Sequence, residues 1–150
     1  MKKKNLSILA LCMVCIMIVL AGCSGNSGKT KTDDTYKIAV ACPLTGGSAT
    51  EGTYVKNGVQ LAVDEFNAKG GINGKTIELI VHDDQNDPKS AATVANAIAG
   101  DDDILAVIGH VSSSCTLAGA AVYQELGLPQ VVVCSSSPAI SDAGDYVFRV

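Results

Sequence analysis

The sequence contains no tryptophan and only two phenylalanines, and aromatic residues make up 4% of its 150 positions. A packed core must therefore be built from valine, isoleucine, leucine and alanine. Basic residues are also few. Residues 1–22 hold three lysines and no acidic residue, so the remaining chain carries 8 basic and 15 acidic residues, a net charge of -7. This acidity argues against nucleic acid, and against an anionic membrane surface, as a binding partner.

The six cysteines match neither a disulfide framework nor a zinc site. Cys12 and Cys15 have the C-x-x-C spacing of redox motifs, but they lie inside an apolar N-terminal segment. Cys42, Cys115 and Cys134 fall in the part of the chain that is expected to fold. Their spacings are unrelated, so at most one disulfide can form and one thiol is left over.

The N-terminus has the pattern of a secretory signal. Three lysines follow Met1, and residues 6–21 form an uncharged apolar segment. This segment is shorter than the run of about 18 residues expected of a spanning helix. Small residues at positions 21 and 22 then precede Cys23, which resembles a bacterial lipobox, whose cysteine receives a diacylglyceryl group. We therefore expect a signal peptide over residues 1–22 and a lipidated Cys23, with an uncleaved membrane anchor as the alternative.

Residues 24–35 are Ser, Gly, Asn, Lys, Thr and Asp, with no apolar residue. We expect residues 23–35 to be a flexible tether with an end-to-end span of roughly 20 Å. Residues 36–150 then have the length of one folded domain.

Short apolar runs alternate with helical patterns in this domain. The apolar runs predict strands over residues 37–42, 76–82, 104–109, 130–134 and 146–150. Apolar residues at helical spacing predict helices over residues 53–68, from Pro88 with Asp87 as N-cap, and over residues 116–126. Strands that alternate with helices predict an α/β fold, in which helices cover both faces of a parallel sheet in three layers.

Polar segments follow three of these strands, over residues 43–52, 109–114 and 134–138. In parallel sheets, ligands sit beyond the carboxyl ends of the strands. Two of the segments contain a serine triplet that opens a helix or turn, where unpaired N–H groups and a positive dipole end suit a carboxylate. The alternative is that these serines only cap helices and form turns.

Other polar motifs fit structural roles better than chemical ones. His82 and the aspartates at 83, 84 and 87 could bind a metal ion, but they lack a defined ligand spacing, and a strand end, a loop and a helix cap account for them. The three aspartates at 101–103 predict a solvated turn. His110 lies three residues before Ser113, but no G-x-S-x-G elbow is present, so we interpret His110 as a strand-end residue. We expect no enzyme activity, no metal and no cofactor.

A series of short motifs resembles the leucine/isoleucine/valine-binding proteins. In chain order the motifs are Asn57-Gly58, Ala68-Lys69-Gly70-Gly71-Ile72-Asn73-Gly74, Asp83-Asp84, Asp87-Pro88-Lys89, Val107-Ile108-Gly109-His110 and Ser135-Ser136-Ser137-Pro138. Those proteins are the substrate-binding components of branched-chain amino acid ABC transporters and have the type I periplasmic binding protein fold. The resemblance covers residues 36–150, and it implies most of the first of two lobes.

The resemblance also implies a ligand site. It places the ligand α-carboxylate on the hydroxyl and N–H of Ser113, beside Ser112, and places the carboxylate and ammonium on Ser135 and Ser136.

Residues 45–52, beginning at Thr45, would form the loop that lines the ligand side chain. Glu51 stands where many relatives have an aromatic residue. A buried carboxylate beside an aliphatic side chain is costly without a partner. Either Glu51 points to water or the ligand is not purely aliphatic.

These residues together predict a lipid-anchored, extracytoplasmic solute-binding protein, held at the membrane on the cell surface or in the periplasm. It would capture an amino acid, branched-chain or related, and deliver it to an ABC transporter permease. The alternative is an extracytoplasmic sensor lobe for amino acids or small amides. A lipid in one leaflet cannot carry a signal across the membrane, and this favours transport.

The lipidation site gives the first testable prediction. Cys23→Ala removes the only thiol that follows a small-residue cleavage pattern, so we expect lipid attachment and processing at this site to stop. Cys15→Ala, within the apolar segment, should leave both intact. Incorporation of radiolabelled palmitate measures the difference, and equal labelling of the Cys23→Ala variant and the unaltered chain would refute the assignment.

Overall fold

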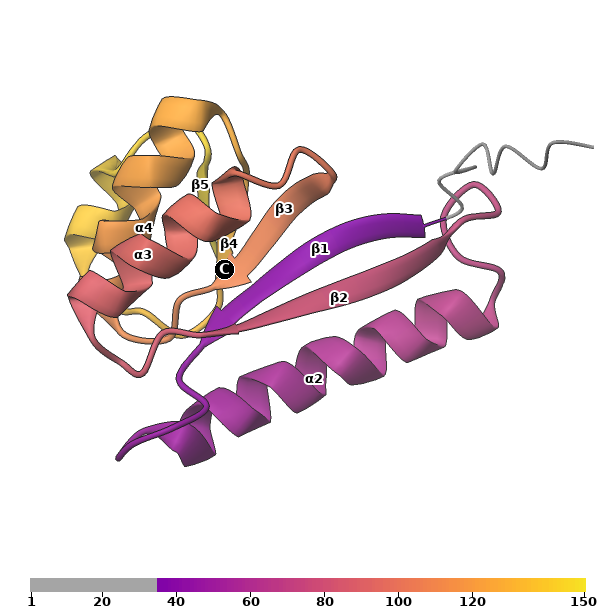
Figure 1. Ribbon diagram of the computed structural model, residues 1–150, viewed down its shortest axis with the longest axis horizontal. Helices are drawn as coiled ribbons and strands as arrows, with labels where there is room; N and C mark the ends of the chain where they lie inside the picture. Colours follow the sequence, from indigo (N-terminus) through magenta and orange to yellow (C-terminus); the bar gives the residue numbers. More distant parts are fainter. Residues whose placement is uncertain (1–34) are drawn as a thin grey trace, which may run out of the picture. The chain divides into compact units, whose positions relative to one another are not determined.

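The computed structural model describes residues 35–150 (Figure 1). The predicted signal peptide, Cys23 and nearly all of the tether lie outside the described residues. The elements are β1 (Thr35–Cys42), α2 (Ala49–Ala68), β2 (Thr76–Asp83), α3 (Pro88–Ala99), β3 (Ile104–Gly109), α4 (Ser113–Leu126), β4 (Gln130–Val132), the 3-10 helix η2 (Pro138–Asp142) and β5 (Val147–Arg149). None of the helices in residues 35–150 is long and apolar enough to cross a membrane.

The five strands form one parallel sheet in the order β2-β1-β3-β4-β5. This confirms the predicted α/β fold. The chain runs outward from β1 to β2 and then crosses to the other side of β1 to build β3, β4 and β5. The strand order therefore reverses between β1 and β3, and the carboxyl ends of these two strands are the expected place for a ligand.

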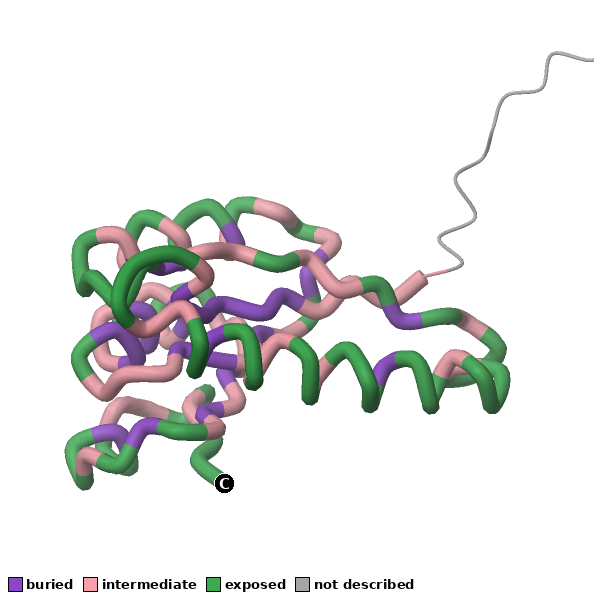
Figure 2. Tube along the Cα trace, turned by 90° about the horizontal axis from the view of Figure 1, so that it is seen from below, coloured by how far each residue is buried: buried purple, intermediate pink, exposed green. Residues whose placement is uncertain are grey.

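The buried core lies between the sheet and the pair α3 and α4. Ala39, Ala41 and Val107 on the strands pack with Ile98 of α3 and Tyr123 of α4, all of them fully buried. Alanines on a strand let the covering helices come close to the sheet. Helix α2 lies on the opposite face, alongside β1 and β2 (Figure 1). Most of its length is exposed, with isolated buried positions (Figure 2).

Two helices begin earlier than the apolar pattern predicted. Helix α2 begins at Ala49 and α4 at Ser113, so the prediction of a loop through residues 45–52 was wrong from Ala49 onward. The first turns of both helices are mostly polar, so they add nothing to an apolar period. The expected helix start at Asp87 is confirmed, because the Asp87 carboxylate accepts the N–H of Ser90 at 2.8 Å.

The turn at residues 101–103 also differs from the expectation of a purely solvated turn. The ammonium of Lys37 lies 2.7 Å from Asp103 and 3.7 Å from Asp101. The hydrogen bond to Asp103 raises the pKa of Lys37. This pairing joins the amino ends of β1 and β3, which are neighbours in the sheet.

Two glycines of α2 give a matched stability test. A Cβ at Gly52 would lie 1.7 Å from the carbonyl oxygen of Pro43, whereas a Cβ at Gly58 would meet open space. We expect Gly52→Ala to destabilise the fold by about 1–3 kcal/mol through overpacking. Gly58→Ala should stabilise it by about 0.5–1 kcal/mol, because alanine favours the helix. Chemical denaturation measures both, and effects of the same sign would contradict this packing.

Candidate functional site

The carboxyl edge of the sheet brings together the segments that follow β1, β2, β3 and β4. After β1, the N–H of Leu44 donates to the Asp83 carboxylate at 2.8 Å, and the Thr45 hydroxyl donates to it at 2.6 Å. Burial acts to raise the pKa of Asp83, but these hydrogen bonds outweigh it and hold the pKa below its usual value. Asp83, at the end of β2, thus fixes the loop that follows β1.

Three buried side chains in contact with one another, Asp84, His110 and Tyr123, lie beneath this edge and are called the polar line here. Nδ1 of His110 is 2.6 Å from the carboxylate of Asp84, and Nε2 is 3.3 Å from the hydroxyl of Tyr123. All three residues are fully buried. Nδ1 of His110 therefore faces a carboxylate, and Nε2 faces a hydroxyl, so each ring nitrogen has a polar partner inside the fold. Burial, with the nearby charge of Asp84, raises the pKa of Tyr123, which keeps this hydroxyl protonated as a donor.

The backbone of His110 ties the end of β3 to the segment after β4. The Thr116 hydroxyl donates to the carbonyl of His110 at 3.1 Å and lies 2.6 Å from the hydroxyl of Ser135. The Ser135 hydroxyl in turn donates to the carbonyl of Val111 at 3.0 Å. The side chain of Ser135 is therefore held inside the fold.

The N-terminus of α4 opens onto the same edge. Ser112 is its N-cap, but the Ser112 side chain makes no capping bond, and its buried hydroxyl oxygen has no hydrogen-bond partner. The hydroxyl oxygen of Ser113 accepts the N–H of Ser137 at 3.2 Å, which joins α4 to the segment after β4. The first N–H groups of a helix have no intrahelical acceptor, so this end of α4 can bind an anion.

The family model of the periplasmic binding proteins matches residues 35–150. The chain belongs to this family. The leucine-, isoleucine-, valine-, threonine-, and alanine-binding protein of Pseudomonas aeruginosa is 35% identical over 127 residues, 84% of this chain and 34% of that protein. Leu/Ile/Val-binding protein homolog 2 of Brucella abortus is 37% identical over 131 residues, 87% of this chain and 33% of that protein.

Solved structures of this family have the same fold. The branched-chain amino acid substrate-binding protein LivJ of Streptococcus pneumoniae, in complex with isoleucine, matches with a TM-score of 0.73 and 34% identity over 77% of this chain and 33% of its own. The leucine-binding protein LivK of Thermotoga maritima matches with a TM-score of 0.69 and 33% identity over 76% of this chain and 32% of its own. The resemblance to the leucine/isoleucine/valine-binding, type I group is thus confirmed. The chain spans about a third of the length of these relatives.

The structure brings some of the expected site residues together and leaves others apart. Ser112, Ser113 and the segment that contains Ser135 and Ser136 meet at the edge of β3 and β4, and Ser136 is exposed there. Glu51 is also exposed, but it belongs to the first turn of α2. Thr45 is engaged with Asp83, as described above.

Sequence reasoning missed the partners of His110. It correctly placed His110 at a strand end, but the pairing with Asp84 joins residues 26 positions apart, and no local pattern reports it. The one hint in the sequence is a glycine, Gly119, inside a predicted helix. In the structure a Cβ at Gly119 would lie 2.5 Å from Nε2 of His110, so the imidazole ring fits only beside a glycine. With both ring nitrogens occupied, His110 is not placed to act as a base for Ser113.

Acidic residues and cysteines also lie near this edge. Within residues 35–150, no group of His, Cys, Asp and Glu is arranged to hold a metal ion. Cys42, Cys115 and Cys134 are free thiols. Burial, with the charge of Asp84, raises the pKa of Cys42 to about 11, and burial also raises the pKa of Cys115. These two cysteines therefore stay protonated at neutral pH.

The polar line gives a graded stability prediction. Asp84→Ala leaves a buried imidazole without its closest partner, so we expect a loss of more than about 2 kcal/mol. Tyr123→Phe removes only the longer hydrogen bond and keeps the packed ring, so we expect a loss of about 1 kcal/mol. Urea denaturation, with amide exchange of residues 110–116, measures the two losses. Equal losses of stability for Asp84→Ala and Tyr123→Phe would contradict the expectation that the contact of His110 with Asp84 contributes more than its contact with Tyr123.

Proposed function

We propose that this chain forms the first half of an amino acid binding site, in which the N-terminus of α4 and residues 135–137 hold the ligand α-carboxylate. One observation carries this proposal. The N-cap Ser112 leaves its helix end uncapped, and its buried hydroxyl has no partner. A buried polar group without a partner is costly in a finished structure, so its place beside open N–H donors points to a polar ligand.

Ser113 is suited to donate to this carboxylate. Its oxygen already accepts the N–H of Ser137, so its own hydroxyl proton is left to donate. Ser136 is exposed on the neighbouring segment and can add its hydroxyl and N–H. The hydroxyl of Ser135 has partners inside the fold, so Ser135 contributes through its backbone. Charge-assisted hydrogen bonds of this kind are about twice as strong as neutral ones.

The relatives support an amino acid as the ligand and an ABC transporter as the setting. The structure of the S. pneumoniae relative holds isoleucine, and the P. aeruginosa protein is named for five amino acids. The exposure of Glu51 favours the first of its two alternatives, in which its carboxylate faces water and an aliphatic ligand is tolerated. We further propose that Cys23 carries a lipid anchor outside the cytoplasm and that the bound amino acid passes to a membrane permease.

The site can be tested on this chain by NMR titration with leucine. Ligand donors that face water gain little net free energy, because each exchanges a water hydrogen bond for a ligand one. We therefore expect a dissociation constant of roughly 1 mM or weaker, about -4 kcal/mol. The amide signals of residues 112–114 and 135–137 should shift, and Ser113→Ala should weaken binding roughly two- to tenfold.

Two controls separate a carboxylate site from unspecific contact. Leucinamide lacks the carboxylate and should leave the signals at the start of α4 unchanged. Ser141→Ala, an exposed serine of η2, should bind leucine as the unaltered chain does. Shifts that are the same for leucine and leucinamide would contradict the proposal.

A further inference from the structure

Residues 43–48, called the β1 loop here, join β1 to α2 and form one wall of the crevice at the carboxyl edge. The strand order reverses between β1 and β3, so the β1 loop and the start of α4 lie on the two sides of this crevice. The side chain of Asn86 contacts both walls. Its amide donates to the hydroxyl of Ser48, the N-cap of α2, at 3.1 Å, and accepts the thiol of Cys115, in the first turn of α4, at 3.9 Å. A ligand of amino acid size whose carboxylate lies at the start of α4 therefore has the β1 loop beside its other groups.

The sequence of the β1 loop does not by itself fix the shape of the loop. Gly46 has a φ of 78°, a conformation that glycine adopts readily, and the exposed Gly47 adds further freedom. A long backbone hydrogen bond of 3.4 Å, from the N–H of Ala49 to the carbonyl of Gly46, closes the turn. Pro43 is buried, whereas Leu44 is half-buried. Leu44 is therefore the apolar side chain that this loop can offer to a ligand.

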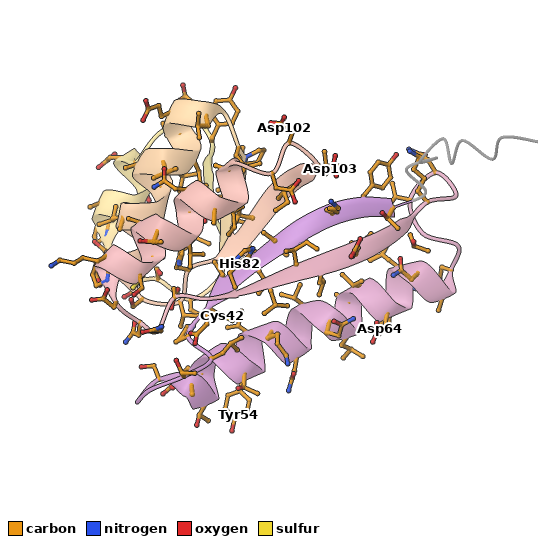
Figure 3. The ribbon with its side chains drawn as sticks, viewed as in Figure 1. Cys42, Tyr54, Asp64, His82, Asp102 and Asp103 are labelled. Carbon is orange, nitrogen blue, oxygen red and sulfur yellow. The ribbon has the colours of Figure 1, made fainter. Side chains whose placement is uncertain are left out.

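The carboxylate of Asp83 holds the first half of the β1 loop. One of its oxygens accepts the N–H of Leu44 at 2.8 Å and the N–H of Gln85 at 2.9 Å, and the other accepts the hydroxyl of Thr45 at 2.6 Å. Asp83 is the last residue of β2 and is paired in the sheet register with Cys42, the last residue of β1 (Figure 3). Hydrogen bonds to an ionised carboxylate are about twice as strong as neutral ones. Asp83 thus fixes the backbone of Leu44 relative to the sheet.

We propose that Asp83 is a positioning residue that sets the selectivity of the site for the ligand side chain, because it holds Leu44 and Thr45 at the wall of the crevice. This inference rests on the amino acid site proposed above. Asp83 itself does not touch the ligand. While Leu44 is held, apolar ligand surface leaves water against a wall that is already ordered; once Leu44 is released, the loop must be ordered first, at an entropic cost.

The opposite wall does not depend on Asp83. The start of α4 and the segment after β4 are held from the buried side, through Thr116 and Ser135. The α-carboxylate is common to all α-amino acids, so its contacts contribute equally to the binding of each. Asp83 therefore acts on the difference between ligands, whereas the start of α4 acts on what they share.

The NMR titration described above tests the inference when it is run with both leucine and alanine. The two ligands share the carboxylate and ammonium and differ only in the side chain. We expect the unaltered chain to bind leucine about three- to tenfold more tightly than alanine, because the larger side chain is partly removed from water. In Asp83→Ala the ratio of the two dissociation constants should fall to about 1–2, through weaker leucine binding. The amide signals of residues 112–114 should still shift with both ligands. Any effect of the lost charge on the ligand carboxylate is the same for both ligands and cancels in the ratio.

Asp83→Asn is the milder variant for the case that Asp83→Ala does not fold. Its amide oxygen can still accept the N–H of Leu44, but its nitrogen cannot accept the Thr45 hydroxyl, so the ratio should lie between those of Asp83→Ala and the unaltered chain. Amide exchange of Leu44 should be faster in Asp83→Ala, which shows that the loop has been released.

Asn67→Ala is the matched control for a loss of stability alone. The Asn67 side chain accepts the N–H of Ile77 at 2.7 Å and donates to its carbonyl at 2.9 Å, which joins the last turn of α2 to the amino end of β2. This variant loses hydrogen bonds from the same strand and the same helix, but at the end away from the crevice. It should leave the ratio of the two dissociation constants unchanged.

The possible failures are distinguishable. An unchanged ratio in every folded Asp83 variant, or an equal weakening of leucine and alanine, would overturn the inference and leave Asp83 with a purely structural role. A change of the ratio in Asn67→Ala as large as in Asp83→Ala would overturn it as well. If leucine leaves the signals of residues 112–114 unshifted in the unaltered chain, the proposed function itself fails, and this inference fails with it.

Discussion

The imidazole of His110 lies where β3 ends, and each of its ring nitrogens faces a buried partner on another element. Asp84 follows β2, and Tyr123 belongs to α4. Because all three side chains are removed from water, each must have its hydrogen bond satisfied within the fold. The ring therefore fixes the distance between the edge strand, the centre of the sheet and the helix layer. Gly119 leaves the space that this arrangement needs.

The position of the proposed ligand site depends on this buried line. The carbonyl of His110 accepts the Thr116 hydroxyl, and Thr116 meets Ser135, so the ends of β3 and β4 are held by groups that never face solvent. The next hydroxyls outward, on Ser113 and Ser136, belong to the proposed ligand site. In the triplet 135–137, the Ser135 side chain thus makes contacts inside the fold, whereas Ser136 is exposed at the surface. Because buried hydrogen bonds already fix the backbone of the proposed site, little conformational entropy is lost when an anion binds there.

The sequence predicted the strands well, because each buried parallel strand is a nearly continuous apolar run, and such runs stand out from their surroundings. It predicted the starts of α2 and α4 poorly, because polar first turns carry no apolar period. The serine segments were found from their position after strands, which follows from the topology. Which serine turns inward was not predictable, since that depends on Thr116, a residue 19 positions from Ser135. The partners of His110 escaped detection for the same reason.

The two faces of the sheet explain the apolar composition of its strands. A parallel strand that is apolar on both sides requires cover on both sides. On one face, α3 and α4 supply that cover, and Ala39 and Ala41 let them pack closely. On the other face, Ile108, Val131 and Phe148 are as apolar as a core requires, yet α2 lies along β1 and β2 only. Within the described residues, Ile108 and Val131 on this half of the sheet are half-buried, and Phe148 is exposed. Hydrophobic free energy scales with the apolar area removed from water, so this face favours any partner that can cover it.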